Sequence, residues 1–482
     1  MSFSHALNNA LSGLTASSRM AEVTADNISN ALTEGFGRRE IRLSSTSLGG
    51  QGGGVKVDEV SRLVDRGILS DRRDAGSARA YQEAIADGFR MLEFETGTVD
   101  DAHSISARIN TFEAALNASA ADPSSNQRLA TVLASAQALT QAIREDAEAI
   151  QATRTEAEHR IAAQVETLNG SLQKVYQLNN SIQELMNSGG DANALVDERQ
   201  RVIDTISGIV PVREVDRQQG KVALITPSGE VLLDGPPSEY AFLARPMVTP
   251  EMSLSGGGLG GITKRGNPLG DDGYSRLAGG SLEAAFKLRD QAMPAAADAL
   301  DEIAADLIGR FEDAGFDATR AAGLPGLFTD AGAEMDMSEL TGLAGRIAVN
   351  DLVNPEEGGA LWRLRSGIGA AAPVNAGDSA QLTLYADALA DKRSLPVTGG
   401  LVASVATHAG GWVGDVSLGR VNAEEALGFA SARYDTMKAA EYEGGVDTDF
   451  EMQQLLIIEQ SYAANARVVQ TIDQMMRRLL EI

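Results

Sequence analysis

The chain has 482 residues, a formal net charge of -26 and no cysteine. One hydrophobic core rarely grows beyond roughly 250–300 residues, so we expect about two to four domains. The acidic excess argues against binding to nucleic-acid phosphates or anionic lipid. Without cysteine, the chain has no disulfides, zinc-thiolate sites or thiol nucleophiles.

The N-terminal segment predicts a helix that ends near Asn30 and carries a narrow apolar stripe. Its stripe residues recur at alternating steps of four and three, which is typical of a coiled-coil seam. They are Leu7, Leu11, Leu14, Ser18, Ala21, Ala25 and Ile28. No basic region with a following apolar core precedes this helix, so we expect no cleaved secretory signal peptide. No apolar run approaches the roughly 20 residues that a membrane helix needs.

The next part of the chain predicts strands and then long helices. Gly35 and Gly37 introduce a strand-like pattern, and the glycine-rich residues 49–54 predict a flexible loop before a strand at 55–60. Helical periodicity dominates 77–187 and is interrupted by a turn at Asp122-Pro123-Ser124.

The second half of the chain is more varied. Short strands between Gly, Pro and Ser clusters predict a small β-rich insert at 206–270. A helix is expected over 281–314, broken or bent by Pro294. Residues 315–377 show few clear periods.

The C-terminal segment predicts a second seam helix. Thr448 and Glu451 have the spacing of a capping box. The seam that follows contains Leu455, Ile458, Tyr462, Asn465, Val469, Ile472, Met476 and Leu479. Because a polar amide in such a seam fixes register, we interpret Asn465 as a register device.

Two seam helices at the chain ends need partners. A helix of about 33 residues is a rod of about 50 Å, and a two-position stripe buries nothing by itself. Covering the large C-terminal seam residues would contribute on the order of 10–15 kcal/mol. We infer that the two ends pair and also contact neighbouring molecules. The alternative from the pattern alone is a two-helix stalk within one molecule.

The motifs of common enzymes are absent from the sequence. There is no P-loop, H-E-x-x-H or G-x-S-x-G, and the 4 histidines are far apart in the sequence. Gly256, Gly258 and Gly261 spell G-x-G-x-x-G, but no apolar strand leads into them and no helix follows, so we interpret them as a loop. We predict no catalytic, metal or cofactor site.

The predicted fold is mainly α with a smaller β part. It combines paired terminal coiled-coil helices, an elongated helical core domain and the small β-rich insert. The predicted segments are 1–33 and 447–482 for the two halves of the terminal pair, 34–205 and 271–446 for the helical core, and 206–270 for the insert.

Both chain ends resemble a known family. The N-terminal positions are similar to the signature of bacterial flagellar axial proteins, which are the rod, hook and hook-associated subunits. These positions are Ser12, Gly13, Asn27, Asn30, Thr33, Gly35, Phe36 and Arg38. The C-terminal residues 459–482 look like the matching C-terminal signature. Phe36 departs from the tyrosine that is usual in the family, and Asp26 stands where asparagine is frequent.

Three interior stretches narrow the resemblance to the hook-associated protein 1 family. Residues 193–215 resemble its leucine-x-aspartate-x-arginine segment, here Leu195, Asp197 and Arg199. Residues 279–294 resemble its glycine pair followed by Arg289-Asp290, and residues 112–133 resemble its first long-helix pair. Between Phe316 and Phe328 the chain is short where longer members insert an outer domain.

The resemblance implies a non-enzymatic structural subunit at the junction between flagellar hook and filament. It implies an extracellular location and export by the flagellar type III apparatus. The implied partners are further copies of the chain, the hook protein, the second junction protein (hook-associated protein 3), an export chaperone and the export apparatus. A rod or hook subunit is the nearest alternative, and an extracellular enzyme displayed on an axial scaffold is the alternative from another class.

Overall fold

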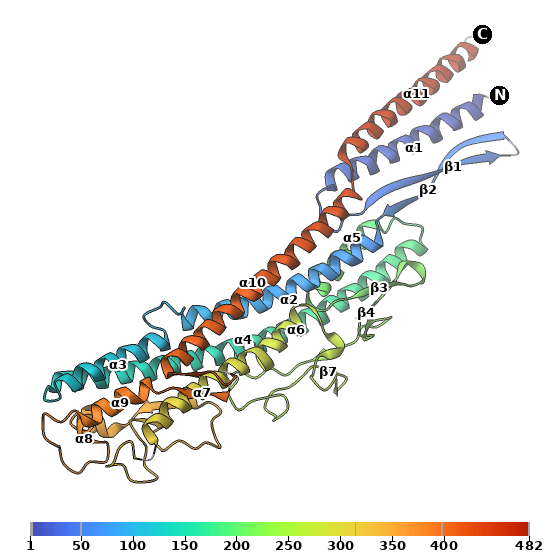
Figure 1. The fold of residues 1–482 in the computed structure, drawn as a ribbon. Coiled ribbons are helices and arrows are strands. Elements are labelled where there is room, and N and C mark those ends of the chain that lie inside the picture. The colour runs from blue at the N-terminus through green and yellow to red at the C-terminus, as the bar shows by residue number, and fades with distance from the viewer. Residues whose placement is uncertain (1–2, 49–50, 314, 397–398, 481–482) are drawn as a thin grey trace. The chain divides into compact units, whose positions relative to one another are not determined.

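A computed structural model describes the chain except residues 1–2, 49–50, 314, 397–398 and 481–482 (Figure 1). The chain divides into two compact units. Unit 1 comprises Met1–Arg79, Thr167–Glu239 and Phe429–Ile482, and unit 2 comprises Ala80–Glu166 and Tyr240–Gly428. Long helices dominate, and the strands of the described residues form small antiparallel sheets, so the predicted mainly α fold with a smaller β part is confirmed.

Unit 1 holds both chain ends. Its own helices and strands are α1 (Phe3–Asn30), β1 (Arg38–Leu48), β2 (Gln51–Leu63), α5 (Asn193–Ile209), β3 (Arg213–Asp216), β4 (Val222–Ile225), β5 (Val231–Leu233) and α11 (Thr448–Leu480). Three boundaries between the units fall within longer helices, which are α2 (Arg66–Thr96), α4 (Asn126–Asn187) and α10 (Val405–Glu443), and the fourth follows Glu239.

Unit 2 holds the shorter helices and the remaining strands. The helices are α3 (Ile105–Ala121), α6 (Gly280–Lys287), α7 (Met293–Glu312), α8 (Arg363–Ser366) and α9 (Ala380–Ala390). The strands are β6 (Tyr240–Ala241), β7 (Thr263–Lys264), β8 (Asn267–Pro268), β9 (Phe328–Asp330), β10 (Ile347–Val349), β11 (Arg393–Ser394) and β12 (Val402–Ala403). No helix among the described residues combines the length and apolarity needed to cross a membrane.

Aromatic side chains form the centre of unit 2. Phe112 of α3, Phe311 of α7 and Phe328 of β9 are at most 1% exposed. The ring of Phe328 meets those of Phe112 and Phe311 edge to face, with centroids 5.6 and 5.0 Å apart. Aromatic pairs of this geometry contribute about 0.5–1.5 kcal/mol beyond their buried area, so α3, α7 and β9 are tied into one core.

The turn predicted at Asp122-Pro123-Ser124 separates α3 from α4, as expected. The backbone N–H of Asp122 donates to Ser119 O at 3.1 Å, which closes α3. Ser125 then accepts a hydrogen bond at its Oγ from Arg128 N, 3.4 Å away, at the start of α4. The helix stop and start residues in the sequence were therefore sufficient to place this boundary.

The helix expected over 281–314 is interrupted before Pro294. A π-helical turn at Leu288–Ala292 separates α6 from α7, and Pro294 lies in the first turn of α7. The helical backbone nevertheless continues from 280 to 312, and Met293 N donates to Leu288 O across the π-helical turn. The expected break is therefore a local change of helix type at 288–292, without a gap in the helix.

The glycine-rich loop predicted at 49–54 is shorter than expected. Residues 49–50 lie outside the described residues, but Gln51 and Gly52 already pair with Leu48 and Ser47. The β1–β2 hairpin therefore includes the glycines from 52 onward, and its register places Leu43 opposite Val57. Cross-strand pairing with β1 overrides the weak strand propensity of glycine.

The strands expected in 206–270 are confirmed in two separate sheets. One sheet has the order β3-β4-β5 and the other β6-β7-β8. Residues 315–377, which showed few periods, contain the short β9–β10 pair and the one-turn helix α8. The five segments predicted from the sequence stay a prediction.

Candidate functional site

The terminal helices α1 and α11 lie side by side, with the N- and C-termini at the same end of the pair (Figure 1). They approach closely at Gly13, where an added Cβ would lie 2.7 Å from Nδ2 of Asn465. Neighbouring small residues of α1, Ala10 and Ala16, are also buried. Close approach of the two backbones therefore depends on small side chains in α1.

The predicted α11 seam is divided between buried and exposed residues. Ile458 and Ile472 are 4% and 8% exposed. The half-buried seam residues are Leu455, Asn465 and Val469. The remaining three stay open to solvent in the single chain: Tyr462 (48% exposed), Met476 (47%) and Leu479 (58%).

The buried face of α1 differs from the predicted seam. Leu11 is 48% exposed, and the other large seam residues, Leu7, Leu14 and Ile28, are only half-buried. The buried residues are Ala10, Ala16, Ser17, Val23, Thr24 and Asn27. Within the single chain the buried face is broader than the expected stripe, because α1 packs against β2 as well as α11. Ser12 takes part in the second contact, since its Oγ accepts a hydrogen bond from Val55 N at 3.1 Å.

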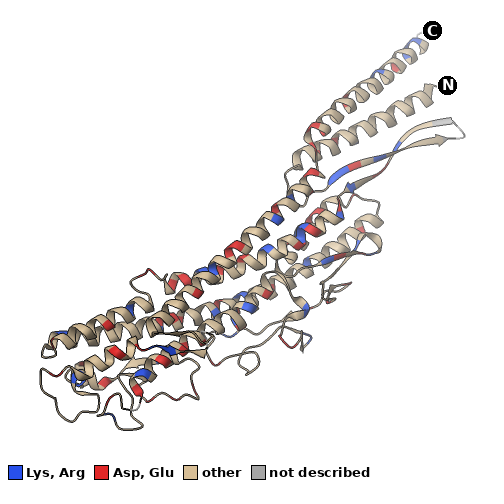
Figure 2. Cartoon of the chain, in the orientation of Figure 1, with Lys and Arg blue, Asp and Glu red and all other residues tan. Residues whose placement is uncertain are grey.

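Helix α1 is poor in charge, and α11 is rich in exposed apolar side chains. In Figure 2, α1 is tan along most of its length, and its charged residues are Arg19, Glu22 and Asp26. On α11 the exposed apolar residues beyond the seam are Met452, Leu456, Ile457, Val468, Met475 and Leu480. Exposed apolar side chains in this number mark an interaction surface, so α11 has surface left for further contacts.

A buried carboxylate anchors the hairpin in unit 1. Asp197 of α5 is 5% exposed and accepts three hydrogen bonds. The donors are Gly37 N at 3.2 Å, Arg39 Nη2 at 3.1 Å and Arg62 Nε at 2.8 Å. Because both strand ends donate to one side chain, Asp197 fixes the base of the hairpin on α5.

Asn27 joins the end of α1 to β1. Its Nδ2 donates to Arg39 O at 2.9 Å, and its Oδ1 accepts from Arg39 N at 2.9 Å. The side-chain amide thus occupies both backbone groups of Arg39 as a neighbouring strand would. Asn27 is 1% exposed, so these bonds are shielded from water.

The segment after α1 is a compact turn made by the remaining family-like positions. Asn30 donates from Nδ2 to Asp26 O at 3.0 Å, and Thr33 donates from Oγ1 to Asn30 Oδ1 at 3.3 Å. Gly35 has a φ of 78°, which L side chains rarely adopt, and its carbonyl accepts from Arg62. The ring of Phe36 lies 4.9 Å from the Arg39 guanidinium, a cation–π contact that does not need the family's tyrosine hydroxyl.

Arg38 links β1 to the start of α11. Its Nε donates to Oε1 of Glu451 at 2.7 Å, and Glu451 is 3% exposed. The predicted capping box is therefore wrong: Glu451 is used by Arg38, and Asp447 caps the helix by accepting from Asp449 N and Phe450 N at 3.0 and 3.1 Å. We call Asn27, Arg38, Arg39, Asp197 and Glu451 the hairpin anchor.

Comparisons with known proteins agree with these features. The family described as the flagellar hook-associated protein FlgK helical domain matches residues 93–327, and the flagellar basal body rod FlgEFG protein C-terminal family matches residues 443–482. The flagellar hook-associated protein 1 of Bacillus subtilis (strain 168) is 22% identical, over 98% of this chain and 97% of its own length. These matches support assignment of the chain to the flagellar hook-associated protein 1 family.

A solved structure of the same family is also similar, at a low level. The flagellar hook junction protein FlgK from Burkholderia pseudomallei aligns with a TM-score of 0.43 and 17% identity. The alignment covers 54% of this chain and 46% of that chain, so the chain spans less than half of that structure.

The family's interior motifs have structural roles here. In the leucine-x-aspartate-x-arginine segment, Asp197 forms the centre of the hairpin anchor and Leu195 is half-buried. Arg199 donates from Nη1 to Asn179 Oδ1 at 2.9 Å and to Gly220 O at 2.6 Å. The motif therefore joins α5 to the hairpin through Asp197 and to α4 through Arg199.

The Arg289-Asp290 motif lies in the π-helical turn of unit 2. Arg289 is fully buried and contacts Glu158 Oε2 at 2.5 Å, Asp290 Oδ2 at 2.7 Å and Gly260 O at 3.1 Å. Glu158 of α4 also accepts from Arg245 N at 2.8 Å. This buried network fixes the loop after β6 against α4, which is a packing role.

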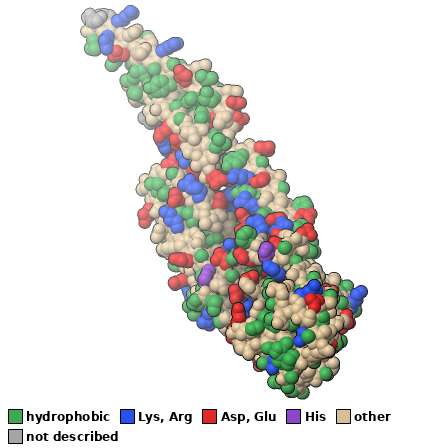
Figure 3. All heavy atoms as spheres, turned by 90° about the vertical axis from the view of Figure 1, so that its left-hand side faces the viewer, with side chains coloured by type: hydrophobic (Ala, Val, Ile, Leu, Met, Phe, Trp, Pro, Cys, Tyr) green, Lys and Arg blue, Asp and Glu red, His purple; other side chains and the backbone are tan. Residues whose placement is uncertain are grey.

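Sequence reasoning missed several partners of the hairpin anchor. Arg62 was not identified, and Glu451 was assigned to a capping box, because their partners Asp197 and Arg38 lie 135 and 413 positions away in the chain. Across the described ranges, no group of three or more His, Asp or Glu side chains is arranged to hold a metal ion. On the face shown in Figure 3, acidic and basic side chains are interspersed with hydrophobic ones.

Proposed function

We propose that this chain is the structural subunit that joins hook to filament in the bacterial flagellum and assembles with copies of itself into a ring of helically arranged subunits. The chain is similar to the flagellar hook-associated protein 1 of Bacillus subtilis along almost the whole length of both proteins. The observation that carries the proposal is the apolar surface of α11 that stays exposed to solvent in the single chain. Leu479 and Leu480, at 58% and 85% exposed, are unusual on a free surface.

The proposed contact surface is the seam named from the sequence. On α1 and α11 it comprises Leu7, Leu11, Leu14, Ile28, Leu455, Ile458, Tyr462, Asn465, Val469, Ile472, Met476 and Leu479. The buried members hold α1 to α11, and the exposed members contact neighbouring subunits. Burial of one large apolar side chain contributes about 1.5–3 kcal/mol, so several such contacts would offset the entropy of ordering the chain ends.

The proposal includes an order of events. The terminal helices are largely unstructured in the free, exported monomer and fold when they dock. The chain acts outside the cell, without enzymatic activity, after export by the flagellar type III apparatus with a chaperone. The hook protein and hook-associated protein 3 are the proposed neighbours along the axis.

Electron microscopy of cells lacking this chain tests the proposal, together with an assay for filament subunits in the medium. Bare hooks with shed filament subunits are expected. Missing hooks would instead indicate a rod or hook subunit, the alternative that the rod-family match at residues 443–482 favours. Normal filaments would contradict both.

A further inference from the structure

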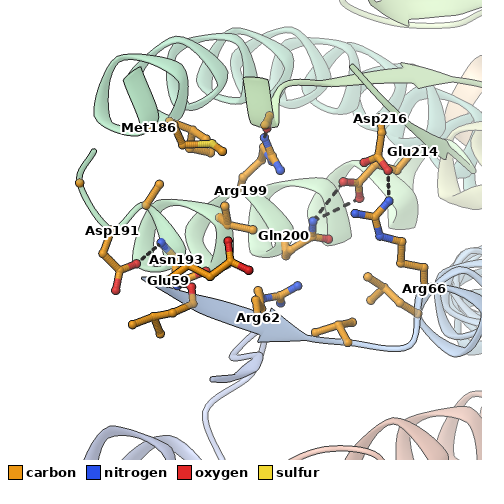
Figure 4. A pocket seen from close by; sticks show the side chains of 18 of the residues that line it. Glu59, Arg62, Arg66, Met186, Asp191, Asn193, Arg199, Gln200, Glu214 and Asp216 are labelled. Carbon is orange, nitrogen blue, oxygen red and sulfur yellow. Dashed lines mark hydrogen bonds and ion pairs between the residues drawn. The ribbon is translucent and has the colours of Figure 1, made fainter. Parts of the chain in front are cut away.

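Unit 1 contains a cavity of about 920 Å³ that the terminal helix pair does not explain. Residues of β2, of the first turns of α2, of the end of α4 and of α5 line it (Figure 4). Its wall is rich in arginine: Arg19, Arg62, Arg66, Arg73, Arg199 and Arg213. The chain is acidic overall, so the question is what balances the positive charge of these guanidinium groups.

The carboxylates of the wall are already paired. Glu214 contacts Arg73 at 3.0 Å, and Asp216 pairs with Arg66. The other three also have cationic partners: Asp191 with Arg19 at 3.6 Å, Asp58 with Lys56 at 3.8 Å and Glu59 with Arg42 at 3.1 Å. These side chains therefore do little to neutralise a further cation in the wall.

Arg199 has no carboxylate partner among the described residues. It is 4% exposed, and its hydrogen bonds go to the neutral oxygens of Asn179 and Gly220, 2.9 and 2.6 Å away. Its Nε is buried and has no hydrogen-bond partner in the described chain. Buried charges in proteins are normally paired with an opposite charge, so this site is incomplete.

The electrostatic surroundings of Arg199 add to this argument. Burial lowers the pKa of Arg199 to about 10. Glu214 acts in the opposite direction, but the charges of Arg62, Arg66 and Arg73 lower the pKa further. Burial is the largest of these influences, so the Arg199 guanidinium would gain from a further opposite charge beside it.

We propose that this cavity binds a small oxyanion, held by Arg199 with the other arginines of the wall around it. A guanidinium presents a planar fork of N–H donors that matches phosphate and carboxylate oxygens. An anion there would supply the missing opposite charge and reduce repulsion among the four arginines. The inference does not depend on the proposed function at the hook–filament junction.

Calorimetric titration of the full chain with sodium phosphate tests the proposal, with sodium chloride at equal ionic strength as the reference. Saturable one-site binding is expected with phosphate and not with chloride. Hydrogen exchange should slow at residues 195–201 and 218–222, which surround Arg199. Arg199→Gln should weaken phosphate binding at least about tenfold, because a charged hydrogen bond is lost.

Two further variants keep the test decisive if Arg199→Gln does not fold. Arg66 has a 74% exposed side chain in the cavity wall, so Arg66→Gln should fold and weaken binding by about two- to fivefold. Arg217 is similarly paired, with Asp234 at 2.8 Å, but lies outside the wall, so Arg217→Gln should bind phosphate as the unmodified chain does. Absence of saturable binding, or equal affinity of the unmodified chain and Arg66→Gln, would overturn the proposal.

Discussion

The core of unit 2 and the terminal helix pair of unit 1 use apolar side chains in opposite ways. In unit 2, Phe112, Phe311 and Phe328 are at most 1% exposed and contact one another. On α11, Tyr462, Met476 and Leu479 are 47–58% exposed although they continue the same stripe as the buried Ile472. The aromatic core of unit 2 is thus buried within one chain, whereas the α11 stripe is buried only in part.

This contrast indicates where each region obtains its stability. A closed aromatic core is stable within one chain, and mutations there act on folding. A helix with exposed apolar residues gains most of its stability from partners, and mutations there act on assembly. Effects on folding and on assembly should therefore separate between the two regions.

The largest expected effect is loss of assembly in Ile472→Asp. Ile472 is 8% exposed, so the new carboxylate would be buried without a partner in the helix pair. We expect unit 2 to unfold at an unchanged urea midpoint and incorporation into flagella to be abolished. Gln470→Asp places the same charge on an exposed position of α11 and should incorporate normally. Normal incorporation of Ile472→Asp would show that the helix pair does not depend on partner contacts in the way proposed for it.

The next largest effect is expected for Asp197→Asn, which removes the charge at the centre of the hairpin anchor. Arg39 and Arg62 would lose their shared carboxylate, and breaking such a buried pair costs about 3 kcal/mol. Hydrogen exchange at residues 37–41 should accelerate by about a hundredfold or more. Glu198→Gln, a neighbouring change at a carboxylate with a 41% exposed side chain, should leave this exchange rate unchanged. Equal hydrogen-exchange rates in the two variants would show that Asp197 does not hold the base of the hairpin.

A smaller effect is expected on the exposed face of α11. Met476→Ser should change monomer stability by less than about 0.5 kcal/mol, because Met476 is 47% exposed. Incorporation should nevertheless fall several-fold in competition with the unmodified chain, since the lost contact forms only between subunits. The exposed Gln474 provides the control, and Gln474→Ser should compete equally. Loss of monomer stability in Met476→Ser would mean that this residue packs within the chain.

A further prediction concerns the pH dependence of unit 2. Asp146 is 6% exposed, and burial, with Glu145 adding to it, raises its pKa from 3.8 to about 8. The folded unit therefore holds a proton that the unfolded chain releases, and Asp146 makes stability fall as pH rises from about 4 to about 8. In Asp146→Asn, the urea midpoint of unit 2 should fall less over this range. An unchanged slope would show that Asp146 is ionised in the folded unit.

The sequence was sufficient for features that depend on neighbouring residues. The end of α1 at Asn30 and the turn at Asp122 followed from local backbone preferences, whereas the break expected at Pro294 is only a π-helical turn in a continuous helix. The α11 seam gave the buried positions Ile458 and Ile472, because a regular period identifies one face of a helix.

Features that depend on distant partners were beyond the sequence pattern. The buried face of α1 could not be predicted from its own period, because β2 covers part of it. Glu451 is spaced as a capping residue, yet it pairs with Arg38, 413 positions away. The family resemblance pointed to Asp197, but only the fold gives its three donors.

The contact between Gly13 and Asn465 has a mechanical consequence. Sliding α11 along α1 by one helical turn, about 5.4 Å, would place Asn465 against Asn9 or Ser17, whose side chains occupy the space that glycine leaves free. The contact therefore fixes the axial register of the two helices, so a force along the axis of one helix is transmitted to the other.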